Sequence, residues 1–136
     1  MQPTRVRDVM QEKIVTISVS DRLSTVEDIM TLGRVRHIPV VRLGRLVGVV
    51  SERDLLRASL SNLAHRRDER RAFLEEIDIA SVMSTPPVVV APDATVAQAA
   101  RTMAERKIGC LPVVDGDELV GLVTETDLLR YFASNL

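Results

Sequence analysis

The sequence contains two copies of one unit, separated by a constant offset of 73 residues. The pair Val9-Met10 returns as Val82-Met83, and residues 6–63 align without a gap with residues 79–136. Of the 58 aligned positions, 19 are identical, whereas roughly three would be expected by chance from average composition. The chain is therefore a tandem duplication, and both halves are expected to adopt the same fold.

Each repeat predicts the element order β-α-β-β-α. In the first copy, residues 14–17 form a short β-type run, and apolar residues at helical spacing predict a helix over residues 23–33. Strands are expected over residues 38–42 and 45–50, joined by a tight turn and followed by a last helix. The fold class is therefore mixed α/β (α+β), with two units related by a pseudo-two-fold axis and packed through their sheets. The expected N-caps of the first helices are Ser24 and Thr25, and Asp93 and Thr95.

A charged segment separates the two copies. Residues 65–71 form the only strong charge run, and the segment around them lacks Gly and Pro and spaces its apolar residues as a helix does. We interpret it as a helical connector with a solvated face; a phosphate- or partner-binding patch is the alternative. The predicted organisation is a first repeat over residues 1–63, a connector over residues 64–78 and a second repeat over residues 79–136.

The composition excludes several functional classes. With 18 Lys+Arg against 19 Asp+Glu, the chain lacks the excess positive charge with which nucleic-acid binders neutralise phosphates. Its 2% aromatic content offers few stacking platforms for single strands. No apolar run reaches the ~18 residues of a membrane span, the first residues do not resemble a signal peptide, and the single cysteine leaves no cluster for zinc. We therefore expect a cytoplasmic protein with no membrane span and no nucleic-acid partner.

The most sharply repeated motif places a hydroxyl residue at the end of a strand and an aspartate three positions later. It occurs as Ser51 with Asp54 and as Thr124 with Asp127. This spacing is close to a capping box, and an acid in the first turn also suits the helix dipole. A short aspartate can instead direct its oxygens outward to accept hydrogen bonds from a vicinal diol such as a ribose, beside helix N–H groups that hold a phosphate. On chemistry alone the two interpretations are about even.

Basic residues precede the proline of the next strand in both copies. They are Arg34, Arg36 and His37 in the first copy, and Arg106 and Lys107 in the second. Apolar side chains and backbone beside the proline offer a slot for a flat ring, and the cations can face an anion. The alternative, solvated residues at a helix-to-strand corner, is favoured for any single arginine. The recurrence of the corner next to the hydroxyl–aspartate motif weakens that alternative.

Catalytic and metal-binding motifs are not found in the sequence. It contains no HExxH, GxSxG, P-loop or dinucleotide fingerprint. Cys110 aligns with His37, so a Cys–His pair is one interpretation, but a small buried hydrophobic residue is favoured for Cys110. We therefore predict no catalytic residues, no metal site and no enzymatic activity.

The apolar-Pro-Val-Val strand, the Leu-Val-Gly hairpin and the Ser/Thr-x-x-Asp-Leu-Leu helix start, in the same order in both copies, resemble the tandem CBS (cystathionine-β-synthase) domain pair, or Bateman module. The resemblance covers nearly the whole chain. It implies a regulatory module that binds AMP, ADP, ATP, S-adenosylmethionine or NAD in the cleft between the repeats, requires no cofactor and has no catalytic activity. Because no enzyme, channel or transporter domain accompanies the pair, we expect a stand-alone sensor that signals to an unknown effector protein.

The resemblance also assigns roles to residues. The family's ribose-binding acid falls on Asp54 and Asp127, and its phosphate-binding base falls on Arg36 and His37 of the first copy. The second copy lacks that cation unless Lys107 or Arg106 replaces it, so the two sites are expected to differ and the first is the stronger candidate. Adenine is expected against the first strand and the pre-proline segment. The predicted nucleotide-binding residues are Val15, Thr16, Ile17, Arg36, His37, Ile38, Pro39, Ser51 and Asp54, and Val88, Val89, Val90, Lys107, Cys110, Leu111, Pro112, Thr124 and Asp127.

Family pairs commonly associate through their helices, so the resemblance further implies a homodimer. The competing function is a dimerisation or interaction module whose ligand clefts are empty or vestigial. The intact hydroxyl–aspartate motif in both copies favours the sensor.

Overall fold

The computed structural model describes residues 2–60 and 67–135, and these form two compact units. The unit that we call the first-copy unit consists of described residues between Val15 and Pro87. The second-copy unit combines the described residues before Val15 with those from Val88 onward. The spatial division therefore cuts across the predicted sequence boundaries, because the segment that opens each repeat folds with the other repeat. The repeat boundaries themselves stay a prediction from the sequence.

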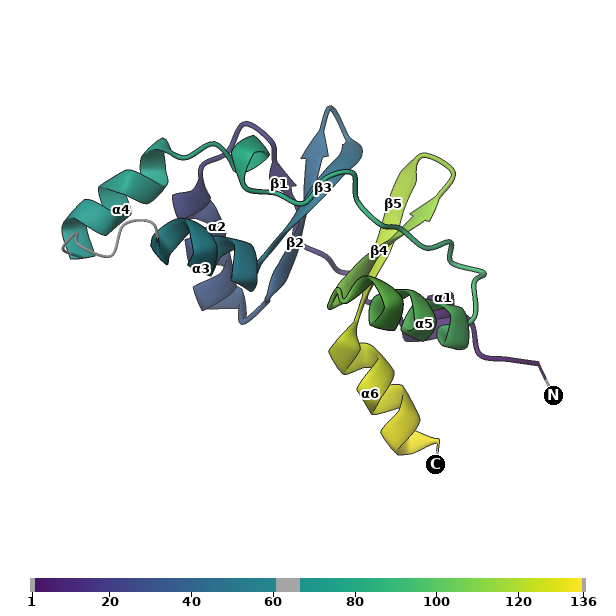
Figure 1. The fold of residues 1–136 in the computed structure, drawn as a ribbon. Coiled ribbons are helices and arrows are strands. Elements are labelled where there is room, and N and C mark those ends of the chain that lie inside the picture. The colour runs from purple at the N-terminus through teal and green to yellow at the C-terminus, as the bar shows by residue number, and fades with distance from the viewer. Residues whose placement is uncertain (1, 61–66, 136) are drawn as a thin grey trace. The chain divides into compact units, whose positions relative to one another are not determined.

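The first-copy unit is built around a three-stranded sheet of order β1-β2-β3 (Figure 1). Strand β1 is parallel to β2, and β2 is antiparallel to β3. The expected first strand over residues 14–17 is shorter and later, because only two residues of this run pair with β2. The elements are β1 (Ile17–Ser18), α2 (Leu23–Gly33), β2 (His37–Arg42), β3 (Arg45–Ser51), α3 (Glu52–Leu60), α4 (Arg67–Glu76) and the 3-10 helix η1 (Ile79–Ser81).

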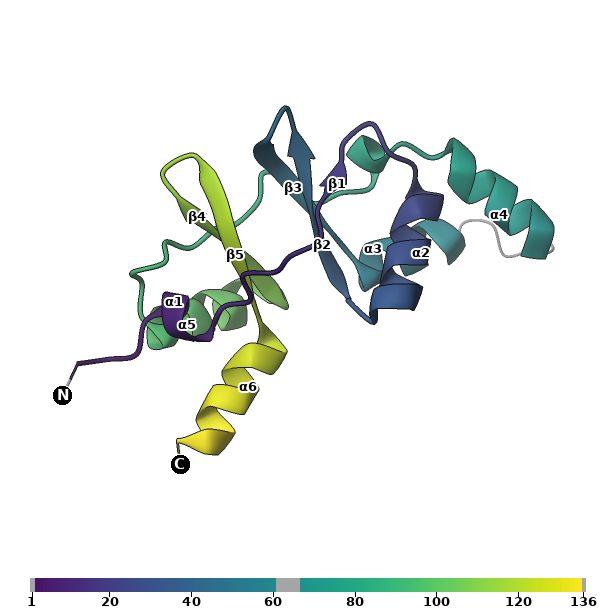
Figure 2. The same ribbon diagram turned by 180° about the vertical axis from the view of Figure 1, so that it is seen from behind.

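The second-copy unit contains a two-stranded antiparallel sheet, β4-β5. Val90 makes a single parallel bridge to Val113, at the position where Ile17 pairs with Val40 in the other unit. The expected strand over residues 88–90 is therefore reduced to this bridge. Figures 1 and 2 both show α1 beside α5, although the two helices come from opposite ends of the chain. The elements are α1 (Val6–Val9), α5 (Val96–Arg106), β4 (Cys110–Asp115), β5 (Glu118–Thr124) and α6 (Glu125–Ser134).

The structure confirms the tandem duplication and the mixed fold class. Helix α5 and strands β4 and β5 begin and end 73 residues after α2, β2 and β3. The two hairpins even share a register irregularity, between Val40 and Val41 in one and between Val113 and Val114 in the other. None of the described helices is long and apolar enough to cross a membrane.

Each unit buries its own hydrophobic core. The apolar stripe of α2 contributes Leu23, Val26 and Met30 to the first core, and the equivalent stripe of α5 contributes to the second. Complete burial of a side chain of this size contributes about 1.5–3 kcal/mol. The 3.6-residue periodicity therefore identified the helix faces that hold each unit together.

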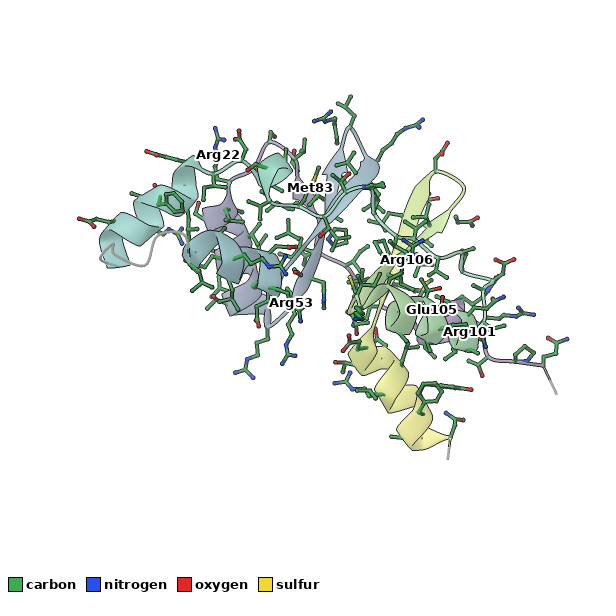
Figure 3. All side chains as sticks on the ribbon, viewed as in Figure 1. Arg22, Arg53, Met83, Arg101, Glu105 and Arg106 are labelled. Atoms are coloured by element: carbon green, nitrogen blue, oxygen red, sulfur yellow. The ribbon has the colours of Figure 1, made fainter. Side chains whose placement is uncertain are left out.

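The segments that open the two repeats pair with β-strands, and they explain the glycine of the Leu-Val-Gly motif. Gln11 exchanges two backbone hydrogen bonds with Leu122 on β5, at 2.8 and 2.9 Å, and Ser84 does the same with Val49 on β3, at 3.2 and 2.8 Å. Each segment crosses its strand above a glycine. A Cβ added at Gly48 would lie 2.9 Å from the Ser84 carbonyl oxygen and 2.7 Å from the Sδ of Met83, which is labelled in Figure 3. Only a residue without a side chain permits this close approach.

The N-termini of α2 and α5 are fixed differently. Thr95 caps α5 as expected, because its hydroxyl accepts from the Gln98 N–H at 3.1 Å and its own N–H donates to Gln98 Oε1 at 2.8 Å. The expectation of Ser24 or Thr25 as the cap of α2 is wrong. The N-cap position is Arg22, which makes no side-chain cap, and the first helical N–H, of Leu23, donates instead to the Ile77 carbonyl at 3.2 Å. The segment after α4 thus replaces a cap.

The connector is helical, as expected, over the residues of α4. Part of the charge run, residues 65 and 66, lies outside the described residues. Within the described part, the run is not only a solvated face. Arg71 donates to both carboxylate oxygens of Asp28 on α2, at 2.8 and 2.9 Å, and its guanidinium also lies 3.5 Å from Glu27 and from Glu75. These contacts and the buried Leu74 hold α4 against the first-copy unit.

The Arg71–Asp28 pair predicts a pH-dependent attachment of α4. The hydrogen bond from Arg71 lowers the pKa of the Asp28 carboxyl in the folded protein. A lowered folded-state pKa stabilises the fold above the ordinary carboxyl pKa of about 3.9, and this contribution is lost as the pH falls through the lowered value. We expect the protection factors of the α4 amide hydrogens, which are corrected for the intrinsic pH dependence of exchange, to fall below pH 4 and in high salt, because the pair is exposed and screened. Arg71→Gln should remove both dependences, and an unchanged exchange profile in that variant would contradict the assignment.

Candidate functional site

The hydroxyl–aspartate motif of the first-copy unit forms a reciprocal cap at the start of α3. The Ser51 N–H and Oγ–H donate to Oδ2 of Asp54 at 2.8 and 3.0 Å, and the Asp54 N–H donates to Ser51 Oγ at 3.1 Å. The capping interpretation is therefore confirmed. The cap uses only Oδ2 of Asp54, and Oδ1 makes no hydrogen bond to another described residue. The cap thus leaves an acceptor for a ligand, and the two interpretations do not exclude each other.

The second-copy unit repeats the cap at the start of α6. The N–H and hydroxyl of Thr124 donate to Oδ2 of Asp127 at 2.8 and 3.0 Å, and the Asp127 N–H lies 3.3 Å from Thr124 Oγ1. Here the carboxylate has a third partner. Nε2 of Gln11 lies 3.2 Å from both Oδ1 and Oδ2 of Asp127.

Gln11 was not among the residues expected at either site. The repeat alignment places it opposite Ser84, and that difference in side-chain length was the available signal. Nothing in the local sequence indicated that residue 11 would pair with the second repeat, 116 positions from Asp127.

The pre-proline corner and the helix start are adjacent in both units. His37 opens β2 directly opposite Ser51, and the Arg36 carbonyl accepts from the first N–H of α3, that of Glu52, at 2.7 Å. The equivalent bond in the second-copy unit joins the Glu125 N–H to the Gly109 carbonyl at 3.0 Å. The two motifs that the sequence singled out therefore form one corner in each copy.

This arrangement changes the expected source of positive charge. Three of the N–H groups around the start of α3, those of residues 51, 52 and 54, already donate within the protein. Fewer helix N–H groups are available to a phosphate than the sequence suggested. Positive charge at this corner therefore comes mainly from side chains, of which Arg36 is exposed and His37 is half-buried. In the second-copy unit Lys107 is exposed and directly follows α5. The last residue of that helix, Arg106, is labelled in Figure 3.

The residues expected around adenine divide into three groups by their exposure. Val15, Thr16 and Val89 are exposed, so their side chains are accessible. Val88 and Val90 are half-buried. The third set is buried and can offer a ligand little besides main-chain atoms: Ile17, Ile38, Pro39, Cys110, Leu111 and Pro112.

Cys110 is a buried thiol rather than a reactive one. Burial, and to a smaller extent the negative charge of Glu125, raise its pKa to about 12. Since the thiolate is the nucleophile, this environment favours the interpretation of Cys110 as a small apolar residue. Among the described residues, no group of three or more His, Cys, Asp or Glu side chains is arranged to hold a metal ion.

Comparison with known proteins agrees with this architecture. The family model for the CBS domain matches the chain twice, over residues 6–61 and 78–134. The CBS domain-containing protein YhcV of Bacillus subtilis is 32% identical over 130 residues, which cover 96% of this chain and 86% of YhcV. The uncharacterized protein MJ1404 of Methanocaldococcus jannaschii is 30% identical over 139 residues, covering 98% of this chain but a third (33%) of that protein.

Among solved structures, CBSX2 in complex with AMP superposes with a TM-score of 0.80 at 26% identity, covering 97% of this chain and 98% of CBSX2. The duplicated hairpins, the two capped helices and the two family matches lead to one conclusion: the chain belongs to the CBS domain family and carries a pair of CBS domains.

Proposed function

We propose that this protein is a regulatory sensor that binds an adenosine-containing ligand, with its principal site at the corner of the first-copy unit. The observation that carries the proposal is the geometry of Asp54, whose Oδ2 holds the cap while Oδ1 has no protein partner among the described residues. A carboxylate fixed in this way is an acceptor for the two hydroxyls of a ribose. The AMP complex of CBSX2, which is similar to this chain, supports the same class of ligand.

The proposed roles follow from position. Asp54 and Ser51 hold the ribose, while Arg36 and His37, on the adjoining corner, face the phosphate. Val15 and Thr16 precede β1 and remain exposed, so they provide one side of the slot for the purine. The equivalent residues of the second-copy unit form a weaker site, in which Lys107 supplies the charge. The output passes to an effector protein, and the proposed module has no catalytic role of its own.

Calorimetric titration of the whole protein with AMP, ATP, S-adenosylmethionine and NADH tests this function. At least one of these ligands is expected to bind. Arg36→Gln should weaken the binding of AMP more than the binding of adenosine, because it removes charge only from the phosphate subsite. Arg45→Gln, an exposed arginine at the start of β3, is the matched control and should leave binding unchanged. Absence of heat and of thermal stabilisation with all four ligands would contradict the sensor and favour the interaction module.

A second proposed property, homodimerisation, is favoured by apolar side chains that α3 and α6 leave exposed. Leu56 and Leu60 on α3 and Leu129 on α6 are each more than half exposed, and Phe132 is partly so. Leu56 and Leu129 occupy equivalent positions in the two copies. Equivalent exposed leucines on equivalent helices suit a symmetric interface with a second copy.

The double variant Leu56→Glu/Leu129→Glu is expected to shift the protein from dimer to monomer at tens of micromolar, because each substitution places a charge in an apolar contact. Analytical ultracentrifugation measures the change. Leu43→Glu is the matched control, since Leu43 is almost fully exposed at a hairpin turn away from these helices in the sequence. A wild-type protein that sediments as a monomer would contradict the dimer.

A further inference from the structure

We propose that Gln11 is a built-in competitor for ligand at the second-copy site, so that the ligand occupies Asp54 before Asp127. This inference rests on the proposed function and adds an order of occupancy to it. The corners of the two units share their cap and their backbone geometry, but only the second has a side-chain amide on its carboxylate.

The amide of Gln11 meets the same chemical requirement as a ribose. A vicinal diol donates O–H hydrogen bonds to a carboxylate, and the amide nitrogen of a carboxamide donates an N–H hydrogen bond that both carboxylate oxygens can share. Nε2 of Gln11 is equidistant, at 3.2 Å, from both oxygens of Asp127. The Oδ1 atom that stays available on Asp54 is therefore engaged on Asp127.

Backbone hydrogen bonds position the Gln11 side chain beside Asp127. Two hydrogen bonds with Leu122, at 2.8 and 2.9 Å, fix residue 11 on β5, the strand that leads into Thr124 and α6. Met10 lies against Gly121 beside it. The contact with Asp127 thus follows from the pairing of the segment around Gln11 with β5, and not from a freely moving chain.

The first-copy unit provides an internal comparison. Ser84 occupies the position equivalent to Gln11 and pairs with Val49 through the same two backbone bonds, at 3.2 and 2.8 Å. Its single-carbon side chain makes no hydrogen bond to Asp54 in the described structure. One pair of residues, Gln11 and Ser84, therefore accounts for the difference between the two carboxylates.

The competition is expected to be modest in size. The Gln11–Asp127 bonds are exposed to solvent, and exchanging such a bond for one with a ligand changes affinity by roughly two- to ten-fold. A ligand at sufficient concentration displaces Gln11, which gives the protein a high-affinity and a low-affinity response to the same molecule.

The test exchanges the two residues. With AMP as the probe in calorimetry, the wild-type protein is expected to show a tight site that is lost in Asp54→Asn and a weaker one that is lost in Asp127→Asn. Gln11→Ser should tighten the weaker site by roughly two- to ten-fold, and Ser84→Gln should weaken the tight site. The double exchange should reverse the order of the two sites.

A ligand-free measurement tests the contact separately. The side-chain amide proton resonances of Gln11 are expected to shift in Asp127→Asn and to stay unchanged in Asp54→Asn. Identical Gln11 resonances in all three proteins would overturn the inference. AMP binding whose two affinities do not change in Gln11→Ser would overturn the competition but leave the sensor intact. Absence of binding by every variant with AMP, ATP, S-adenosylmethionine and NADH would overturn the proposed function and the competition with it.

Discussion

Asp54→Asn is expected to weaken AMP binding by about ten- to a hundred-fold, which corresponds to the roughly 1.5–3 kcal/mol of hydrogen bonds to a charged group. Asparagine keeps one oxygen, which the Ser51 N–H and hydroxyl require at 2.8 and 3.0 Å. Its NH₂ then replaces Oδ1, so a donor faces the ribose hydroxyls where an acceptor stood. Because the cap keeps its geometry, the fold should lose only about 0.5–1 kcal/mol, at the low end of the range for a lost cap.

Two measurements separate the ligand role of Asp54 from its structural role. Calorimetry gives the affinity, and chemical denaturation without ligand gives the free energy of unfolding. Asp127→Asn is the matched control, because it changes the same cap in the other unit and should leave the tight site intact. Asp54→Asn that binds AMP and ATP as well as the wild type would show that the residue only caps α3.

Gly121→Ala and Gly48→Ala are expected to cause the largest losses of stability, about 1–3 kcal/mol each, the usual cost of overpacking. A Cβ at Gly121 would lie 2.6 Å from Met10 Sδ and 2.9 Å from the Gln11 carbonyl oxygen. The methionine side chain can move, but the carbonyl accepts a backbone hydrogen bond from Leu122 and cannot retreat without breaking it. Gly121→Ala should therefore also disturb the contact between Gln11 and Asp127.

Gly33→Ala is the control for both variants. An added Cβ there meets only Val35, at 3.9 Å, and alanine is favoured over glycine in a helix by about 1 kcal/mol. Urea denaturation should show this variant at or above wild-type stability. If Gly48→Ala and Gly121→Ala proved as stable as the wild type, the segments around Ser84 and Gln11 would not lie as closely on β3 and β5 as the structure places them.

The elements that depend on local pattern were predictable from the sequence. The stripe that includes Leu23, Val26 and Met30 predicted the buried face of α2, and the three-residue spacing from Ser51 to Asp54 predicted the cap of α3. The 73-residue repeat then carried both predictions to the second copy. These predictions were correct because periodicity and capping depend on a few residues that are close together in the sequence.

The features that depend on distant pairing were not predictable in the same way. A short segment such as that around Gln11 carries too few residues to specify which of two similar hairpins it joins. The same holds for the start of α2, where Ile77 replaces the cap that Ser24 was expected to provide. The sequence therefore identified the two corners whose motifs the structure brings together, while the difference between the corners came from a residue 116 positions away from Asp127.

The exchange of opening segments has a consequence for the order in which the protein is made. The first-copy unit is continuous, so all its contacts are available once Pro87 has left the ribosome. The second-copy unit encloses it in the sequence, and the segment before Val15 must wait for β5, more than a hundred residues later. Domains fold as their chains emerge, and contacts between distant residues form slowly. The first-copy unit is therefore expected to fold before the second-copy unit. An arrested nascent chain from which Pro87 has emerged from the ribosome should therefore already protect β2 and β3 from proteolysis.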